Sequence, residues 1–378
     1  MRNYIEGAIL EALEKADNLK GKIPGGPKLS VYFEQLASRA ENDLDYIIIR
    51  LQNLLESSVD TVLKQKFMDY KRICEELSIL ENVVIAALLR NKDDVYVNKM
   101  VKAICEEINF PITKPVTSSL SQKYYHIYTG YNLLCIPLLE SDFLLHLPDI
   151  YHELAHPLFA NENRKLRKGQ EELGKFNRVA RKFFDEEINR IKRNSTTPNE
   201  KIDFYHTWKV AWVKNWSVEF FCDLFGIYTL GPAFAWSNLH LCVKSSSNIY
   251  RIPYVQPNSH PPDEARMKAM FYGLELIGYK SESDQIRNKW DEFKQIIQHP
   301  ETDYFFNAVP ESLIKECIKY ALEATIHFGC EIVSPKHPGQ IINLLNNAWT
   351  TFWEDPVSFT GWEKAQVQVL QDNWSKDN

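Results

Sequence analysis

The strongest constraint on this chain is a His-Glu-x-x-His segment, in which His152 and His156 lie four residues apart and Glu153 follows the first histidine. On an α-helix, positions i and i+4 lie one turn apart on the same face, so both imidazoles can bind one Zn²⁺. Glu153 projects toward the same cleft, where a carboxylate can take a proton from a water that the cation activates. The segment predicts a zinc hydrolase in which His152 and His156 are ligands and Glu153 is the general base.

The residues around this motif are mainly apolar, which indicates a buried helix. The apolar positions are Leu144, Leu145, Leu147, Ile150, Tyr151, Leu154, Ala155 and Leu158. A buried His or Glu without partners is costly, and a bound metal removes that cost by coordinating the imidazoles. The alternative is a surface helix that carries two histidines by accident.

A catalytic zinc site needs a third protein ligand and an open fourth position. The apolar and aromatic segment 212–226 contains two acids, Glu219 and Asp223, that are four residues apart and share one helical face. We expect Glu219 to be the third ligand and Asp223 to accept a hydrogen bond from the far nitrogen of His152. The small residues Cys222 and Gly226 would let this helix approach a neighbour closely. The alternative is an amphipathic helix whose acids face water.

A third group of residues lies at Ser259-His260-Pro261-Pro262, followed by Asp263, Glu264 and Arg266. The two prolines keep the backbone extended, and acids in the following turn suit a helix N-terminus. His260 would then stand at a rigid corner, and His260 or Arg266 could donate hydrogen bonds to the oxyanion that forms when water attacks a peptide carbonyl. The alternative is a capped loop whose His and Arg bind local carbonyls.

The order of these three motifs resembles that of the gluzincin metallopeptidases of the CAAX-prenyl protease and heat-shock membrane protease type. The motifs are His-Glu-x-x-His, Glu-Phe-Phe-Cys-Asp-Leu-Phe-Gly and His-Pro-Pro-x-x-x-Arg, and they span residues 152–266, under a third of the chain. The resemblance implies zinc ligands at His152, His156 and Glu219, a base at Glu153, support from Asp223, and active-site roles for His260 and Arg266.

The chain departs from that family in one respect. Many members are embedded in membranes, whereas no stretch here reaches the roughly 18 uninterrupted apolar residues that cross a bilayer. We therefore expect a soluble, cytoplasmic protein without a membrane span, and prenylated substrates are not implied. The net charge of −6 and the pI near 6.0 do not indicate a nucleic-acid-binding protein. The seven cysteines are scattered along the chain, which is typical of reduced thiols in a protein core.

The chain is expected to be mainly α, with an α+β zincin-like core. Residues 1–112 predict a helical N-terminal domain, 113–280 the catalytic core, and 281–378 a helical C-terminal region. The N-terminal bundle shows no catalytic cluster, so it is either scaffold or a docking module for a regulatory protein partner. The charged helical segment 163–193 favours a solvated face over a partner site.

Aromatic and β-branched runs around a Gly-containing turn predict a β-hairpin over residues 124–137, directly before the metal helix. Pro137 suits an edge strand, because proline cannot donate to a ladder. By the same resemblance, this edge would pair with an extended substrate backbone.

The function that these motifs predict is zinc-dependent hydrolysis of peptide bonds, by an endopeptidase rather than an exopeptidase, on a protein or peptide substrate. Two alternatives stay open. One is a helical sensor or interaction protein with a structural or degenerate zinc site, which four protein ligands would favour. The other is a zinc hydrolase that acts on a non-peptide bond.

Overall fold

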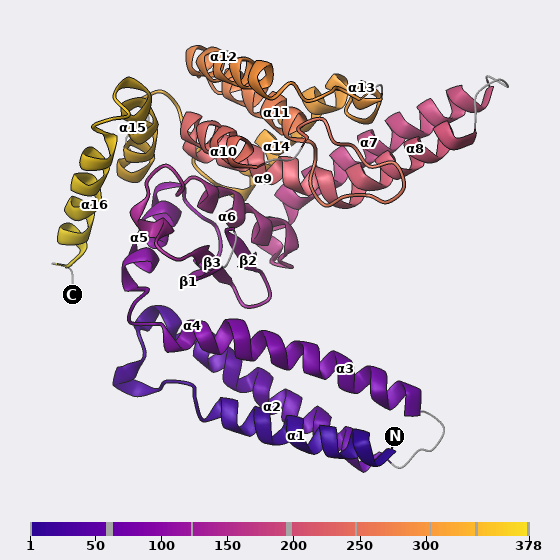
Figure 1. Ribbon diagram of the computed structural model, residues 1–378, viewed down its shortest axis with the longest axis vertical. Coiled ribbons are helices and arrows are strands. Elements are labelled where there is room, and N and C mark those ends of the chain that lie inside the picture. The colour runs from indigo at the N-terminus through magenta and orange to yellow at the C-terminus, as the bar shows by residue number, and fades with distance from the viewer. Residues whose placement is uncertain are drawn as a thin grey trace. The chain divides into compact units, whose positions relative to one another are not determined.

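The computed structural model describes residues 2–57, 63–121, 124–193, 199–245, 248–302, 304–336 and 339–375. These residues form a mainly helical protein with one small three-stranded sheet, which confirms the expected fold class at this level (Figure 1). The chain divides into two compact units. One contains residues 1–101, 115–141 and 374–378, and the other contains 102–114 and 142–373. The three-domain division expected from the sequence stays a prediction.

The first unit is a helical bundle that also contains the sheet. Its helices are α1 (Arg2–Lys20), α2 (Glu34–Glu56), α3 (Leu63–Ile79), a π-helical stretch (Leu80–Ile85), α4 (Ala86–Leu89) and the first half of α5 (Val95–Glu107), with 3-10 turns at Gly26–Lys28 and Val31–Phe33. Apolar residues at helical spacing, among them Leu36, Ala40, Leu44, Ile47 and Leu51 of α2, are fully or almost fully buried. Burial of this stripe is what holds the bundle together.

The sheet has the strand order β1-β3-β2, with β1 at Val116–Ser121, β2 at His126–Tyr128 and β3 at Leu133–Pro137. Strands β2 and β3 form the predicted antiparallel hairpin, and β1 pairs with β3 in parallel. The edge position inferred from Pro137 is wrong, because β3 is the central strand. Pro137 is its last residue, where the missing N–H helps to end the strand.

Two buried polar residues of the first unit hold β1. The Asn98 side chain donates to the Thr117 carbonyl at 2.7 Å and accepts from the Thr117 N–H at 2.9 Å, and the Ser118 hydroxyl donates to Asp94 at 2.5 Å. Val116, Leu133 and Cys135 join the apolar core of the bundle. The sheet is therefore part of this unit's core. Its predicted pairing with substrate stays a prediction.

The second unit contains helices joined by loops, and no strand among its described residues. It contains α6 (Asp149–Ala160), α7 (Arg167–Arg193), α8 (Asn199–Ala211), a π-helical turn (Trp212–Trp216), α9 (Ser217–Leu230), α10 (Pro232–Lys244), α11 (Asp263–Leu276), α12 (Lys280–Ile297), α13 (Phe305–Ala308), α14 (Glu311–Phe328), α15 (Gln340–Glu354) and α16 (Phe359–Ser375), with 3-10 turns at Glu140–Asp142, on the border of the two units, and Arg164–Leu166. Helix α9 packs against α6, α10, α11 and α14 and is almost completely buried.

Small residues let neighbours approach α9 closely, as the sequence predicted for Gly226. A Cβ on Gly226 would lie 2.7 Å from the Phe234 ring of α10, so only glycine allows this contact. Gly231 joins α9 to α10 with φ of +89°, a conformation that glycine adopts without strain. The helix pair α9–α10 is thereby fixed next to α6.

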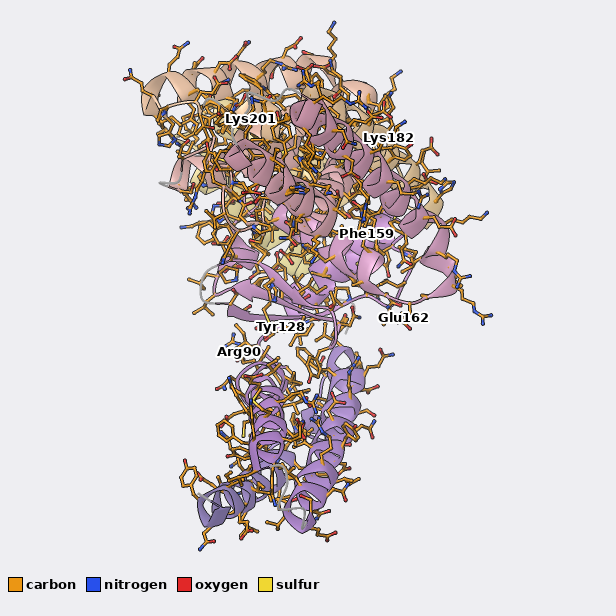
Figure 2. The ribbon with its side chains drawn as sticks, turned by 90° about the vertical axis from the view of Figure 1, so that its right-hand side faces the viewer. Arg90, Tyr128, Phe159, Glu162, Lys182 and Lys201 are labelled. Carbon is orange, nitrogen blue, oxygen red and sulfur yellow. The ribbon has the colours of Figure 1, made fainter. Side chains whose placement is uncertain are left out.

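Helix α7 turns its charged side chains outward. Lys182 projects from it in Figure 2, with 78% of its side chain exposed. Ion pairs along the helix join Lys182 to Glu186 and Arg190 to Glu187, while Phe176, Ala180 and Phe184 are buried. This arrangement agrees with the solvated face expected for this segment. Within the described ranges, no helix is long and apolar enough to cross a bilayer.

Candidate metal centre

The His-Glu-x-x-His segment lies on α6, a buried helix as expected. Ile150, Tyr151, Leu154, Ala155 and Leu158 have no exposed surface. His152 is 9% exposed, whereas Glu153 and His156 are partly exposed. Both histidines face α9, because His152 contacts Asp223 and His156 contacts Cys222 of that helix.

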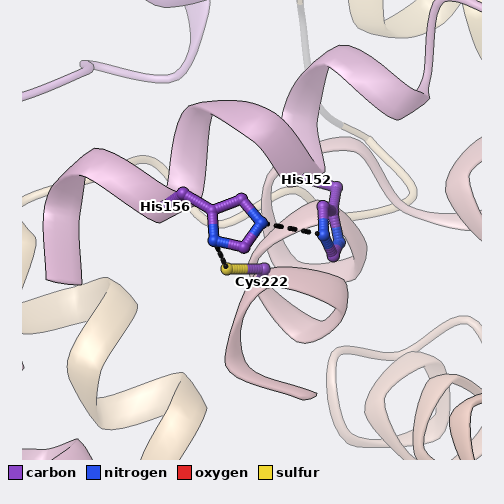
Figure 3. A group of neighbouring side chains, drawn as sticks. All are labelled: His152, His156 and Cys222. Carbon is purple, nitrogen blue, oxygen red and sulfur yellow. Dashed lines mark hydrogen bonds between the residues drawn. The ribbon is translucent and has the colours of Figure 1, made fainter. Parts of the chain in front are cut away.

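The two histidines meet through the nitrogens that a metal would use. Nε2 of His152 lies 3.1 Å from Nε2 of His156 (Figure 3), and 3.5 Å from Oε2 of Glu219. Two ligands of a tetrahedral zinc with bonds of 2.0–2.1 Å are separated by about 3.3 Å. Each of these separations from His152 fits a pair of ligands on one zinc ion.

Glu219 is a buried carboxylate whose Oε2 accepts no hydrogen bond within the described part of the chain. Burial would raise the pKa of Glu219, but the facing His152 outweighs it and lowers this pKa below its usual range. A buried, ionised oxygen without a hydrogen bond is costly unless a cation satisfies it. The donor set of two imidazoles and one carboxylate suits zinc, so these residues fit the predicted metal.

Asp223 makes the contact with His152 that the sequence predicted. Its Oδ1 lies 2.9 Å from Nδ1 of His152, and the carboxylate has no exposed surface. Burial alone would lower the pKa of His152, but its contacts with Asp223 and Glu219 raise it to about 10. Asp223 thus fixes the ring so that Nε2 faces His156 and Glu219.

Arg266 of α11 binds the same carboxylate. Its Nε donates to Asp223 Oδ2 at 2.7 Å and its Nη2 donates to Oδ1 at 2.6 Å. Burial would raise the pKa of Asp223, yet the guanidinium and His152 lower it well below its usual range. Because two of its donor nitrogens are bound to Asp223, the geometry favours an anchoring role for Arg266 over the oxyanion contact that the sequence also allowed.

His260 lies beside Glu219, with its Nε2 at 3.4 Å from Oε2 of that carboxylate and 60% of its side chain exposed. On the other side of the ring, the Ser259 hydroxyl lies 2.8 Å from Nδ1. The imidazole is therefore held between Ser259 and Glu219 while it stays accessible from solvent.

The segment before His260 is fixed to the π-helical turn that precedes α9. Trp216 Nε1 donates to the Asn258 side chain at 3.0 Å, and the Asn215 amide donates to the Asn258 carbonyl at the same distance. A π-helical turn within a helix is frequent at functional sites. Here one turn both begins the helix that carries Glu219 and holds the corner that carries His260.

A second donor set overlaps with the first. His152, His156 and Cys222 have ligand atoms within 4.8 Å of one another. The Cys222 Sγ lies 3.6 Å from Nδ1 of His156, whereas Nε2 of that ring faces His152 (Figure 3). Glu219 approaches His152 on the Nε2 side. The assignment of Glu219 as the third ligand stays a prediction.

No protein-family model, curated protein or solved structure matches this chain. Its relation to the gluzincin peptidases therefore rests on the three motifs and stays a prediction.

Sequence reasoning missed several contributors to this centre. It gave no role to Asn258 or Ser259, and it treated Cys222 only as a small residue. Phe234 of α10, whose ring lies parallel to that of His152 with centroids 6.5 Å apart, was also missed. One signal was available, because Glu219 and Cys222 are three residues apart and so share a helical face.

Proposed function

We propose that this protein is a zinc-dependent metallopeptidase. The observation that carries the proposal is the meeting of His152 Nε2 with His156 Nε2 at 3.1 Å, beside the buried Glu219 oxygen that accepts no hydrogen bond. His152, His156 and Glu219 would hold the ion. When bound, Zn²⁺ would supply Lewis acidity, which polarises a carbonyl and lowers the pKa of a water molecule.

The protein's own residues would move the proton and hold the reacting groups. Glu153, next to His152 on α6 and partly exposed, would accept a proton from the attacking water and later pass it to the leaving amine. Asp223 and Arg266 would keep His152 in place through the three contacts described above. His260, exposed beside Glu219, would donate a hydrogen bond from its ring to the oxygen that becomes negative during attack.

The proposal extends to the substrate class and to the location in the cell. We infer a protein or peptide substrate cleaved internally, because an extended backbone offers the carbonyl that His260 and the metal would stabilise. We also infer a cytoplasmic location: six of the seven cysteines are buried, Cys74 is partly buried, and all seven are free thiols, as a reducing compartment permits. A regulatory partner of the N-terminal bundle stays part of this proposal.

A structural zinc site in an interaction protein is the alternative that one observation favours. His260 Nε2 lies 3.4 Å from Glu219 Oε2, a separation that also fits a fourth protein ligand. A site closed by His260 would have no position for water. Measuring peptide hydrolysis distinguishes a structural zinc site from a catalytic one, because a site closed by four protein ligands would hold zinc without catalysis.

The deciding experiment is zinc analysis combined with a proteome-wide comparison of cleavage by wild type and Glu153→Gln. The variant keeps size and hydrogen bonding but cannot accept a proton. We expect about one zinc per chain in both proteins, and at least a roughly 10²-fold loss of hydrolysis in the variant. Glu162→Gln, an exposed acid just beyond α6, is the matched control and should cleave like wild type. Absence of zinc from wild type after metal supplementation would refute the proposal, as would normal turnover by Glu153→Gln.

A further inference from the structure

The two histidines of the metal centre are supported by adjacent residues of α9. Asp223 Oδ1 lies 2.9 Å from Nδ1 of His152, and Cys222 Sγ lies 3.6 Å from Nδ1 of His156. Each imidazole therefore has its Nε2 toward the other histidine and its Nδ1 against one residue of α9. Figure 3 shows this arrangement for His156 and Cys222. The two supporting contacts are equivalent in position but differ in chemistry.

We propose that Cys222 is the positioning residue of His156, as Asp223 is of His152, and that its sulfur is not a ligand. This inference rests on the proposed zinc site. A histidine that binds a metal through Nε2 is neutral and carries its only proton on Nδ1. That N–H must donate, so the Cys222 sulfur would act as its acceptor and fix both the tautomer and the ring orientation.

The surroundings of Cys222 agree with this role. The residue has no exposed surface and lies between Glu219 and Gly226 on the face of α9 that packs against α6. Its sulfur contacts Nδ1 of His156, whereas the Glu219 oxygen faces Nε2 of His152. In this position a sulfur can orient the ring without competing for the ion.

The chemical difference has a consequence for the metal. A neutral sulfur is a weaker acceptor than an ionised carboxylate. His156 should therefore be held less firmly than His152. Loss of such a supporting contact typically costs about 10- to 100-fold in metal affinity or activity.

The test uses Co²⁺ as a spectroscopic probe in the full-length wild type, Cys222→Ser, Cys222→Ala and Cys317→Ala. Cys317 on α14 is also a fully buried thiol, and in the described part of the chain it makes no hydrogen bond to either histidine, so Cys317→Ala creates a comparable cavity without removing a contact of their rings. The rate of Co²⁺ transfer to excess chelator, followed by visible absorption, should rise about 10- to 100-fold in Cys222→Ala. It should stay near the wild-type rate in Cys317→Ala and in Cys222→Ser, whose hydroxyl still accepts. If Cys222→Ala does not fold, Cys222→Val fills the volume without an acceptor and gives the same comparison.

Three results would overturn the inference, and they are distinguishable. A thiolate-to-cobalt charge-transfer band in wild type that disappears in Cys222→Ser would make Cys222 a ligand. Equal release rates in Cys222→Ala and Cys317→Ala would remove the positioning role but leave the proposed function intact. A wild type that binds neither Co²⁺ nor Zn²⁺ would refute the metal centre itself, and with it this inference.

Discussion

The second unit contains two buried glutamates, Glu264 and Glu219, whose oxygens are satisfied in different ways. Glu264 of α11 is 4% exposed, and its Oε2 accepts from Trp290 Nε1 at 2.6 Å. Lys268 and Lys294 lie within 3.4 and 3.7 Å of its two oxygens. Glu219, in contrast, has a buried oxygen that accepts no hydrogen bond and faces two imidazoles instead of lysines.

This difference separates a structural acid from a candidate ligand. In the Glu264 cluster, the fixed positive charges and the indole N–H already satisfy the carboxylate, so nothing is left for a metal. In the Glu219 cluster, the neighbouring nitrogens can bind a cation together with the carboxylate. A buried acid therefore indicates a metal site only when its partners are themselves ligands.

Metal content should give the largest contrast between the two clusters. His152→Ala or Glu219→Ala should lose the roughly one zinc per chain expected for wild type, because each removes a ligand. Glu264→Gln should keep it, although its folding stability should fall. Elemental analysis of the purified proteins measures the contrast. Zinc retained by both ligand variants would contradict the assignment of the Glu219 cluster.

Substitution of Arg266 should have the next largest effect. We expect it to lower the free energy of unfolding. Arg266→Ala removes both of the guanidinium's hydrogen bonds to Asp223, a carboxylate without exposed surface. Breaking a buried pair from one side typically costs about 3–5 kcal/mol of the free energy of unfolding. Arg287→Ala, which breaks an exposed pair with Glu275, should cost about 1 kcal/mol or less. Urea unfolding of the two variants measures this difference, and equal losses would show that the Asp223 pair is not structural.

Most of the helical fold could be predicted from the sequence, because it depends on local patterns. The helical N-terminal region and the buried helix of the His pair both follow from residues close in the chain. The parallel pairing of β1 with β3 was missed, since no local pattern encodes which strands become neighbours. For the same reason, the prediction that Pro137 lies in an edge strand was wrong.

In the candidate centre, too, some contacts could be predicted from the sequence and others could not. Ligand spacing and the contact between Asp223 and His152 depend on helical periodicity, so they could be predicted. The contacts of Asn258 with the π-helical turn depend on an irregular segment more than 40 residues away from it in sequence, and no periodicity describes it. The sequence left two roles open for Arg266, and only its two hydrogen bonds to Asp223 favour the anchoring role.

His260 should affect catalysis rather than metal binding or folding. Its exposed ring contributes little burial, but it lies beside the proposed ligand Glu219. Loss of one oxyanion donor typically lowers kcat by about 10²- to 10³-fold. His260→Ala should therefore keep zinc and stability and lose kcat more than it raises KM. His240→Ala on α10 serves as the control, and it should turn over like wild type. Full activity in His260→Ala would leave this corner as a capped loop.

Asn258 should have the smallest effect, because it acts through His260. Asn258→Ala removes the acceptor of Trp216 Nε1, and an indole N–H left buried without a partner costs about 1–3 kcal/mol. We expect the corner to loosen and kcat to fall by about tenfold, an effect smaller than that of removing His260 itself. Asn258→Asp, which keeps the side-chain oxygen, should restore most of the activity. The double variant Asn258→Ala/His260→Ala should turn over no more slowly than His260→Ala alone, since residues that act as a unit are not additive. If the two losses multiply instead, Asn258 supports the centre by another route, and the corner is not what positions His260.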